Sequence, residues 1–289
     1  MPYNSVLKPG LFHGQVMIVT GGGSGIGRCT AHELAALGAT VALVGRKQDK
    51  LDTVAAEIHE DGGNAQAYAC DIRVEEQVAA TVKQVIADLG PVHGLVNNAG
   101  GQFPSPLAGI NQKGWETVVR TNLTGGFLMA REVFNQSMQK TGGAMVNIVA
   151  DMWGGMPGMG HSGAARAGMV NLTQTAAIEW GAKGVRCNAV APGWIASSGM
   201  DSYPDSMKPW IRSLQEAVPC KRLGTEAEVS GAICFLLSPA SAFISGTTVR
   251  IDGGASQGTR VWPLPKATNN AAYDGFHRSR VPNVLKEND

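Results

Sequence analysis

The chain has 289 residues, of which 44% are hydrophobic and 16% are charged, and its formal net charge is +1. This near-neutral balance argues against a nucleic-acid-binding surface or a polybasic membrane patch, because both need an excess of Lys and Arg. No apolar run approaches the ~18 residues that span a membrane, and the first residues lack the basic-then-apolar pattern of a secretory signal. We therefore expect a cytoplasmic protein that binds a small molecule, with no nucleic-acid or membrane partner.

The cysteines are widely spread along the chain, and none is paired as C-x-x-C. This usage argues against a disulfide framework and against a structural zinc site. We expect reduced, mostly buried thiols and no bound metal. The five residues are Cys29, Cys70, Cys187, Cys220 and Cys234.

Short β-branched runs alternate with segments of helical period from residue 16 onward. Strands are predicted at 16–20, 40–45, 65–70, 93–97, 144–149, 185–190 and 247–251, and helices at 26–37, 48–60, 75–89, 112–139, 163–182 and 226–237. Six of the strands are nearly continuous apolar runs, as expected for strands covered on both faces. The alternation predicts an α/β fold of Rossmann type, with a doubly wound parallel sheet of seven strands in a single domain over residues 1–255.

Two segments fall outside this alternation. The insertion at about 195–220 carries Met200, Tyr203, Met207 and Trp210. These side chains fit either a lid over the site or an interface helix. Residues 256–289 form a C-terminal extension without strong periodicity, which we expect to contact a neighbouring subunit or to be partly loose.

A glycine-rich stretch, TGGGSGIGR at 20–28, follows the first strand and precedes the first helix. Such glycines permit a tight turn and let the backbone approach a pyrophosphate, while the free N–H groups of the next helix face its charge. The position favours a dinucleotide-binding loop over a purely structural turn. The residues assigned to it are Gly21, Ser24, Gly25, Ile26 and Gly27.

The second strand ends in Gly45-Arg46-Lys47, without Asp or Glu. A site specific for NAD usually places a carboxylate here for the ribose 2′-hydroxyl, whereas an arginine can pair with a 2′-phosphate. Arg46 therefore favours NADPH over NADH as the cofactor. The alternative is a solvated basic turn.

Further motifs follow in order: Asp71 in ACDI, NNAG at 97–100, Asn122 in TNLTG and PGWI at 192–195. Together with the glycine-rich loop they resemble the short-chain dehydrogenase/reductase family over about residues 14–254. The resemblance implies a catalytic asparagine at Asn122, for which the alternative is an amide bonded to its own helix backbone. It also implies a homotetramer and assigns further cofactor contacts: Asp71 and Ile72 to the adenine, Asn97, Ala99 and Gly100 behind the cofactor, and Pro192, Gly193, Ile195 and Ser197 to the nicotinamide carboxamide.

The chain departs from the family at its usual catalytic pair, Tyr-x3-Lys. Ser162-x3-Arg166 stands there, and Val149 or Ala150 stands where the family has a serine. A phenol with a pKa near ~10 suits proton transfer to an alkoxide, whereas a serine is a weaker acid and Arg166 does not deprotonate. We therefore expect alcohol–ketone interconversion to be disfavoured. Reduction of an α,β-unsaturated thioester needs mainly donors around the carbonyl oxygen, which Ser162 and backbone amides could supply while Arg166 binds the nicotinamide ribose.

HSGAARAG at 161–168 and NNAGGQF at 97–103 resemble the NADPH-dependent peroxisomal trans-2-enoyl-CoA reductases of this family. The chain also resembles bacterial dehydrogenases of acyclic terpene (citronellol) breakdown. These likenesses imply reduction of an enoyl-CoA at the β-carbon, with an acyl-CoA or terpenoid substrate. The tyrosine assigned to proton transfer in the reductases falls at Val170, and the chain ends in KEND rather than the peroxisomal S-K-L, so we expect a bacterial cytoplasm.

Two more candidates lie beside the end of the fifth strand. Asp151 is either a desolvated proton donor or a cap, and His161 either donates to the substrate oxygen or caps a turn. The methionines of DMWGGMPGMGH at 151–161 fit an apolar wall for an acyl chain or core filler. Two functional alternatives stay open: an alcohol or aldehyde dehydrogenase of acyclic terpene catabolism, and a non-catalytic dinucleotide-binding sensor or scaffold subunit.

Overall fold

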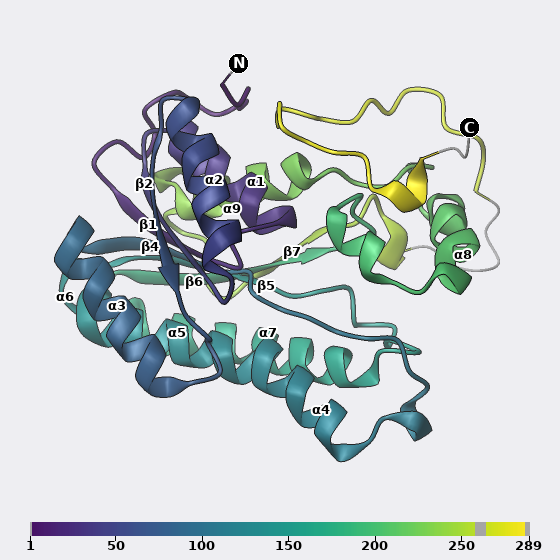
Figure 1. Cartoon of the computed structure of the whole chain (residues 1–289), viewed down its shortest axis with the longest axis horizontal. Coiled ribbons are helices and arrows are strands. Elements are labelled where there is room, and N and C mark those ends of the chain that lie inside the picture. The colour runs from purple at the N-terminus through teal and green to yellow at the C-terminus, as the bar shows by residue number, and fades with distance from the viewer. Residues whose placement is uncertain (1, 258–263, 287–289) are drawn as a thin grey trace.

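Seven parallel strands form one sheet in the computed structural model, which describes residues 2–257 and 264–286 (Figure 1). Their order across the sheet is β3-β2-β1-β4-β5-β6-β7. This order confirms the predicted doubly wound topology. The strands are β1 (Val16–Thr20), β2 (Thr40–Gly45), β3 (Asn64–Ala69), β4 (Val92–Asn97), β5 (Gly143–Ile148), β6 (Val185–Pro192) and β7 (Thr248–Ile251).

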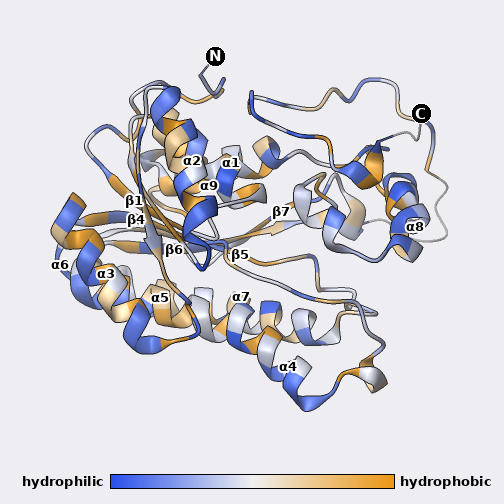
Figure 2. Cartoon of the chain, in the orientation of Figure 1, coloured by the Kyte–Doolittle hydropathy of each residue, from blue (hydrophilic) through white to orange (hydrophobic). Residues whose placement is uncertain are grey.

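Helices cover both faces of the sheet, as Figure 1 shows. On one face lie α1 (Gly25–Ala36), α2 (Gln48–Glu60) and α9 (Glu226–Leu237), and on the other lie α3 (Glu75–Leu89), α5 (Gly125–Val133) and α7 (Gly160–Gly181). Figure 2 shows apolar strands between helices whose outward surfaces are more hydrophilic. The fold therefore has three layers.

The strand β1, apolar at its first four positions, illustrates why this sequence forms a buried parallel sheet. Its five residues are all buried, and their side chains alternate between the two layers. Met17 and Val19 pack in the core beneath α1, α2 and α9, whereas Val16 and Ile18 pack in the core beneath α3 and α5. A strand in the middle of the sheet thus needs apolar residues on both of its faces.

The segment expected as one helix at 112–139 is helical throughout but not uniform. It consists of α4 (Gln112–Val119), α5 and the short α6 (Gln139–Thr141), joined by π-helical turns at Arg120–Thr124 and Phe134–Met138. A π turn widens the helix by one residue and often occurs at functional sites. The first of them carries Asn122, whose side chain is buried.

The insertion before α9 folds into short turns rather than one helix. They are η4 (Ser198–Ser202), η5 (Asp205–Met207), α8 (Lys208–Ser213) and η6 (Leu214–Ala217). A turn of the C-terminal extension, η9 (Asn283–Leu285), packs against them: Val284 N donates to Asp201 Oδ1 at 2.9 Å, and Arg212 Nε donates to Val284 O at 2.8 Å. The described part of the extension thus packs against the insertion of the same chain. Residues 258–263 and 287–289 of the extension lie outside the described residues.

The region around Phe276 in the same extension returns to the N-terminal layer. Phe276 is buried against Tyr3 and α1, and Arg278 pairs with Asp61 beyond α2. The extension therefore links α1 and α2 to the insertion (Figure 1). In the described part of the chain, no helix is both long and apolar enough to cross a membrane.

Candidate active site

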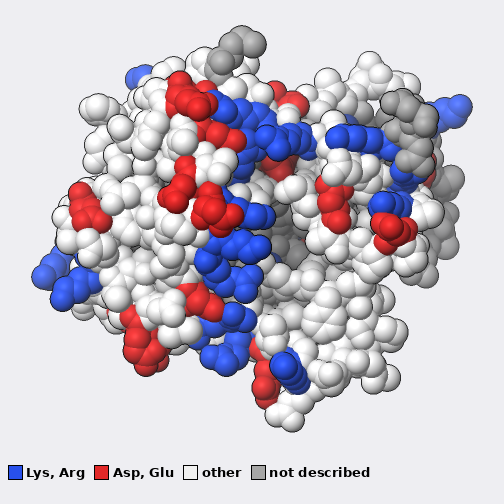
Figure 3. Space-filling view, viewed as in Figure 1, with Lys and Arg blue, Asp and Glu red and all other residues white. Residues whose placement is uncertain are grey.

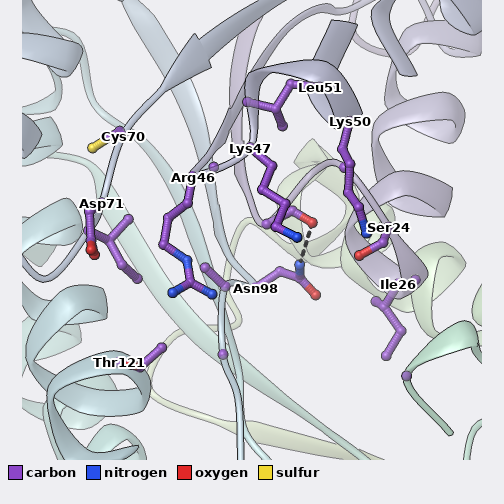
Figure 4. A pocket seen from close by; sticks show the side chains of 18 of the residues that line it. Ser24, Ile26, Arg46, Lys47, Lys50, Leu51, Cys70, Asp71, Asn98 and Thr121 are labelled. Carbon is purple, nitrogen blue, oxygen red and sulfur yellow. Dashed lines mark hydrogen bonds between the residues drawn. The ribbon is translucent and has the colours of Figure 1, made fainter. Parts of the chain in front are cut away.

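A cavity of about 460 Å³ opens at the carboxyl edge of the sheet, where the loops after β1 and β4 diverge. This is the point at which open α/β sheets bind ligands. Lining residues that the sequence analysis assigned to the cofactor are Gly21, Ser24, Gly25, Ile26, Arg46, Asp71, Ile72, Ala99, Gly100 and Ser197. Lining residues that it did not assign include Lys47, Lys50, Asn98 and Thr121 (Figure 4).

The glycine-rich loop passes so close to the β4 loop that side chains would collide. Gly21 and Gly25 have φ of +67° and +58°, a region that glycine adopts without strain. A Cβ on Gly21 would lie 2.8 Å from Asn98 Nδ2, and one on Gly27 would overlap Gly21 O. Gly27 is thus a packing glycine outside the cavity wall, and the open backbone of Gly21 and Gly25 faces the space where a pyrophosphate would fit.

Asn98 and Thr20 fasten the two loops together. Asn98 Nδ2 donates to Thr20 O at 2.9 Å and to Gly21 O at 3.3 Å, while Thr20 Oγ1 accepts from the backbone N of Asn98 and of Ala99, both at 3.0 Å. The neighbouring Asn97 points instead into the core, where its amide donates to Gly126 O and Asn147 Oδ1. Sequence reasoning assigned Asn97 rather than Asn98 to the cavity wall.

Basic side chains surround the mouth of the cavity. Arg46, Lys47 and Lys50 are exposed on its wall, and Figure 3 shows Lys and Arg side chains gathered beside a hollow on this face. Asp71 lies across the cavity and binds Arg73 through Oδ1 at 2.8 Å and Oδ2 at 2.5 Å. These bonds lower the pKa of Asp71 to about 2, so its carboxylate is ionised at neutral pH and can accept from an amino group.

Of the four residues from Pro192 to Ser197 that the sequence analysis assigned to the nicotinamide carboxamide, one lines the cavity. Ser197 lines the wall. Gly193 N donates to Ile251 O at 2.9 Å, and Ile195 is buried and bridged to Gly224. Pro192, at the end of β6, pairs with Ile251. These three residues hold the position of the loop that carries Ser197.

Ser162 lies at the start of α7, completely buried and hydrogen bonded. Its Oγ donates to Gln102 Oε1 at 2.7 Å and accepts from Asn122 Nδ2 at 3.4 Å. Asn122 Oδ1 in turn accepts from Gly101 N at 2.9 Å, which ties the π turn to the loop after β4. The Ser162 proton is thus directed to Gln102, a residue that the sequence analysis did not single out.

Arg166 brings an unpaired positive charge to the floor of the site. Its Nη1 donates to Ile148 O at 2.5 Å, and a Cβ on Gly100 would lie 2.5 Å from its Nη2. Its buried Nε has no hydrogen-bond partner among the described residues. Among the described residues no carboxylate lies within ion-pair distance of Arg166. Burial lowers the pKa of Arg166 to about 10, so the group stays charged at neutral pH and can donate to a ligand against Gly100.

His161 and Asp151 each hold a buried polar atom without a hydrogen-bond partner in the part of the chain that the structure describes. His161 Nδ1 accepts from Ser162 N at 2.8 Å, which leaves the proton of the neutral ring on the unpartnered Nε2. Its ring packs edge-on against the ring of Phe103, with the ring centroids 4.5 Å apart. Asp151 Oδ1 is likewise unpartnered, and Asp151 does not cap α7, whose N-cap is Met159. Such atoms are rare in proteins and mark these two residues as available to a ligand.

The insertion reaches this network through Tyr203. Gln102 Nε2 donates to Tyr203 Oη at 3.1 Å, and the phenol hydroxyl faces Met159 Sδ at 4.0 Å. Trp210 of the insertion packs edge-on against Trp194, with ring centroids 5.3 Å apart. Tyr203 is thus the point at which the insertion contacts the polar site.

Comparison with known proteins agrees with this architecture. A family model described as enoyl-(acyl carrier protein) reductase matches residues 21–256. The solved structure of the citronellol catabolism dehydrogenase AtuB of Pseudomonas aeruginosa PAO1 is 65% identical, with a TM-score of 0.80, and the match covers 88% of this chain and 100% of that one.

Two further relatives are more distant. A Bacillus subtilis protein named as a 2,4-dienoyl-CoA reductase is 35% identical over 244 residues, which are 83% of this chain and 96% of that protein. A second relative is a Beutenbergia cavernae protein named as an NAD(P)-dependent gluconate 5-dehydrogenase, whose structure was solved with bound NADP. It is 30% identical with a TM-score of 0.81, and the match covers 87% of this chain and 100% of that one. With its sheet order, glycine-rich loop and cavity, the chain therefore belongs to the short-chain dehydrogenase/reductase family of oxidoreductases.

Proposed function

We propose that this chain is an NAD(P)-dependent dehydrogenase that interconverts an alcohol and a carbonyl group on an acyclic, branched terpenoid. The observation that carries this proposal is the 65% identity to a citronellol catabolism dehydrogenase, over the full length of that protein. Such identity extends well beyond the glycine-rich loop that all dinucleotide-binding relatives need. The apolar residues near the start of α7 support an apolar substrate, since Met159 is buried there and Met156 packs against Gly163.

The charge around the cavity supports NADPH and NADP⁺ over NADH and NAD⁺. Arg46, Lys47 and Lys50 line the wall at the end of β2, and this strand end carries no carboxylate. An arginine can pair with a ribose 2′-phosphate, whereas a specific NAD site needs an acceptor for the 2′-hydroxyl. Asp71 fits the adenine amino group, and Ser197 fits the carboxamide end of the cavity.

The polar network supports distinct roles at the reacting centre. Bound nicotinamide supplies hydride transfer to or from carbon. Arg166 would hold the cofactor ribose beside Gly100 with donors that no carboxylate of the described residues occupies. His161 donates from Nε2 to the substrate oxygen, Asn122 and Ser162 orient the loop after β4, and Asp151 faces the substrate with an acceptor oxygen.

Reduction of an enoyl thioester is the second candidate, and a specific feature of α7 favours it. Ser162 and Arg166 replace the pair that supplies a proton in ordinary alcohol chemistry, whereas hydride addition to a β-carbon mainly requires donors around the thioester oxygen. His161 Nε2 is such a donor. The 35% identical relative named as a 2,4-dienoyl-CoA reductase adds weight to this candidate.

The test is a panel of substrates, with turnover of each measured by the absorbance of the reduced nicotinamide. Purified protein is incubated with citronellol and NADP⁺ or NAD⁺, and with citronellal, simple ketones or short and branched enoyl-CoAs and NADPH or NADH. We expect turnover of the terpenoid alcohol and aldehyde, with NADP(H) preferred. Turnover of enoyl-CoAs alone would replace the proposal with the second candidate. Tight NADPH binding without turnover on any substrate would indicate a non-catalytic sensor or scaffold.

A further inference from the structure

We propose that Tyr203, carried by the insertion, supplies the proton-transferring phenol that α7 lacks. This inference rests on the proposed dehydrogenase function and names the residue that exchanges the hydroxyl proton. Its basis is a chain of hydrogen bonds in which Ser162 Oγ donates to Gln102 Oε1 at 2.7 Å and Gln102 Nε2 donates to Tyr203 Oη at 3.1 Å. One amide side chain therefore separates the α7 position where the family has tyrosine from a tyrosine of the insertion.

Ser162 itself is poorly suited to exchange this proton. Its hydroxyl donates to Gln102, its oxygen accepts from Asn122, and its side chain has no exposure to solvent. An aliphatic hydroxyl is also a much weaker acid than a phenol. A proton lost from Ser162 would thus leave an alkoxide that is completely buried, which is unfavourable.

Tyr203 has the opposite features. Gln102 donates to its oxygen, a contact that stabilises the phenolate left after proton loss. Among the described residues, the acceptor that faces its hydroxyl proton is the thioether of Met159 at 4.0 Å, which is a weak one. The residue is also only partly buried, so solvent can restore its proton between turnovers.

The insertion is fixed well enough to position a catalytic phenol. Met200, Ile211, Leu214 and Val284 form a buried apolar cluster, and Tyr203 packs against it. Val284 belongs to the C-terminal extension and is bonded to Asp201, two residues before Tyr203. The phenol is therefore anchored by contacts on both sides of the insertion.

The step balances without a further reactant. In the oxidation, the carbinol C–H bond breaks as its hydride passes to NADP⁺, and the substrate O–H bond breaks as its proton passes to the Tyr203 phenolate. A C=O bond and the phenol O–H bond form, and the phenol then loses its proton to water. In the reduction, Tyr203 gives its proton to the oxygen of the carbonyl carbon that receives hydride from NADPH.

The test compares Tyr203→Phe with the wild type on the substrate that it turns over fastest. Removing a general acid–base group costs about 10²–10⁴-fold in rate, so kcat should fall by at least ~100-fold. Thermal unfolding and NADPH affinity, measured by fluorescence titration without substrate, should stay unchanged. Tyr68→Phe is the matched control, because Tyr68 lies on β3 and bonds Asp88, and its kcat should equal that of the wild type.

A second variant separates proton transfer from packing. A fluorinated tyrosine at position 203 keeps the ring and the Gln102 contact but makes the phenol more acidic, so the pH profile of kcat should move to lower pH. Wild-type kcat in Tyr203→Phe, or a pH profile unmoved by fluorination, overturns the role of Tyr203 even where the alcohol activity holds. If only enoyl-CoAs react, the proposed function fails, and the same variants on that reaction decide the role of Tyr203. Absence of turnover on every substrate overturns both.

Discussion

Replacing Arg46 by alanine should weaken NADPH binding while leaving NADH binding nearly unchanged. Arg46 lies on the wall of the cavity at the end of β2, a strand end whose sequence, Gly45-Arg46-Lys47, contains no carboxylate. Hydrogen bonds to charged groups contribute about 1.5–3 kcal/mol, which corresponds to roughly 10- to 150-fold in affinity. Because Arg46 is exposed to solvent, we expect the lower end of this range, or about a tenfold rise in the Kd for NADPH.

The assay is a fluorescence titration of each reduced cofactor against wild type, Arg46→Ala and Lys140→Ala. Lys140 is an exposed cation on α6, away from the cavity lining, and it controls for a general loss of positive charge. The NADPH preference of the wild type should also shrink as salt is added, since screening weakens exposed charge pairs. Equal losses for NADPH and NADH in Arg46→Ala would refute the assignment of Arg46 to a 2′-phosphate.

Other substitutions test the rest of the site and the assembly. Ser162→Ala should lower kcat several-fold with little change in NADPH Kd, whereas Arg166→Ala should damage both by tenfold or more; equal, full activity in both variants would remove these residues from the mechanism. Arg73 lowers the pKa of Asp71 to about 2 in the folded chain, so this pair stabilises the fold above about pH 4 and ceases to do so as the pH falls toward 2. Asp71→Asn should therefore lower the free energy of unfolding in urea by up to about 2 kcal/mol at neutral pH, and this loss should disappear in acid. We also expect a homotetramer that packs through α5 and α7, where the side chain of Ile178 on α7 is 82% exposed. Ile178→Glu should then shift sedimentation to smaller species, and an unchanged sedimentation coefficient would exclude this surface.

The sheet and the cofactor cavity could be predicted because their signals are local. The first four residues of β1 are all apolar since both faces of the strand are covered, and Gly21 lies where a strand turns into a helix. The choice between Asn97 and Asn98 could not be made in the same way. The strand ends between them, and only the tertiary bonds show that Asn97 turns into the core and Asn98 joins the two loops.

The π turn around Asn122 was hidden for a related reason. The apolar spacing of residues 112–139 is compatible with an uninterrupted helix, and a single extra residue in one turn leaves that spacing almost intact. What distinguishes the turn is its partner, since Asn122 Oδ1 accepts from Gly101 in the loop after β4. Hydrogen bonds between distant loops leave no periodic signal in a single sequence.

The same limit explains why the sequence pointed away from alcohol chemistry. Gln102 lies 60 residues from Ser162 and 101 residues from Tyr203 along the chain, so no local pattern connects the three side chains. In the fold, Ser162 is completely buried and its Oγ donates to Gln102 Oε1 at 2.7 Å, although Gln102 itself is an exposed residue. Because Gln102 also bonds Tyr203 of the insertion, one amide side chain separates Ser162 from a phenol, and the absence of tyrosine from α7 does not by itself exclude proton transfer to an alcohol oxygen.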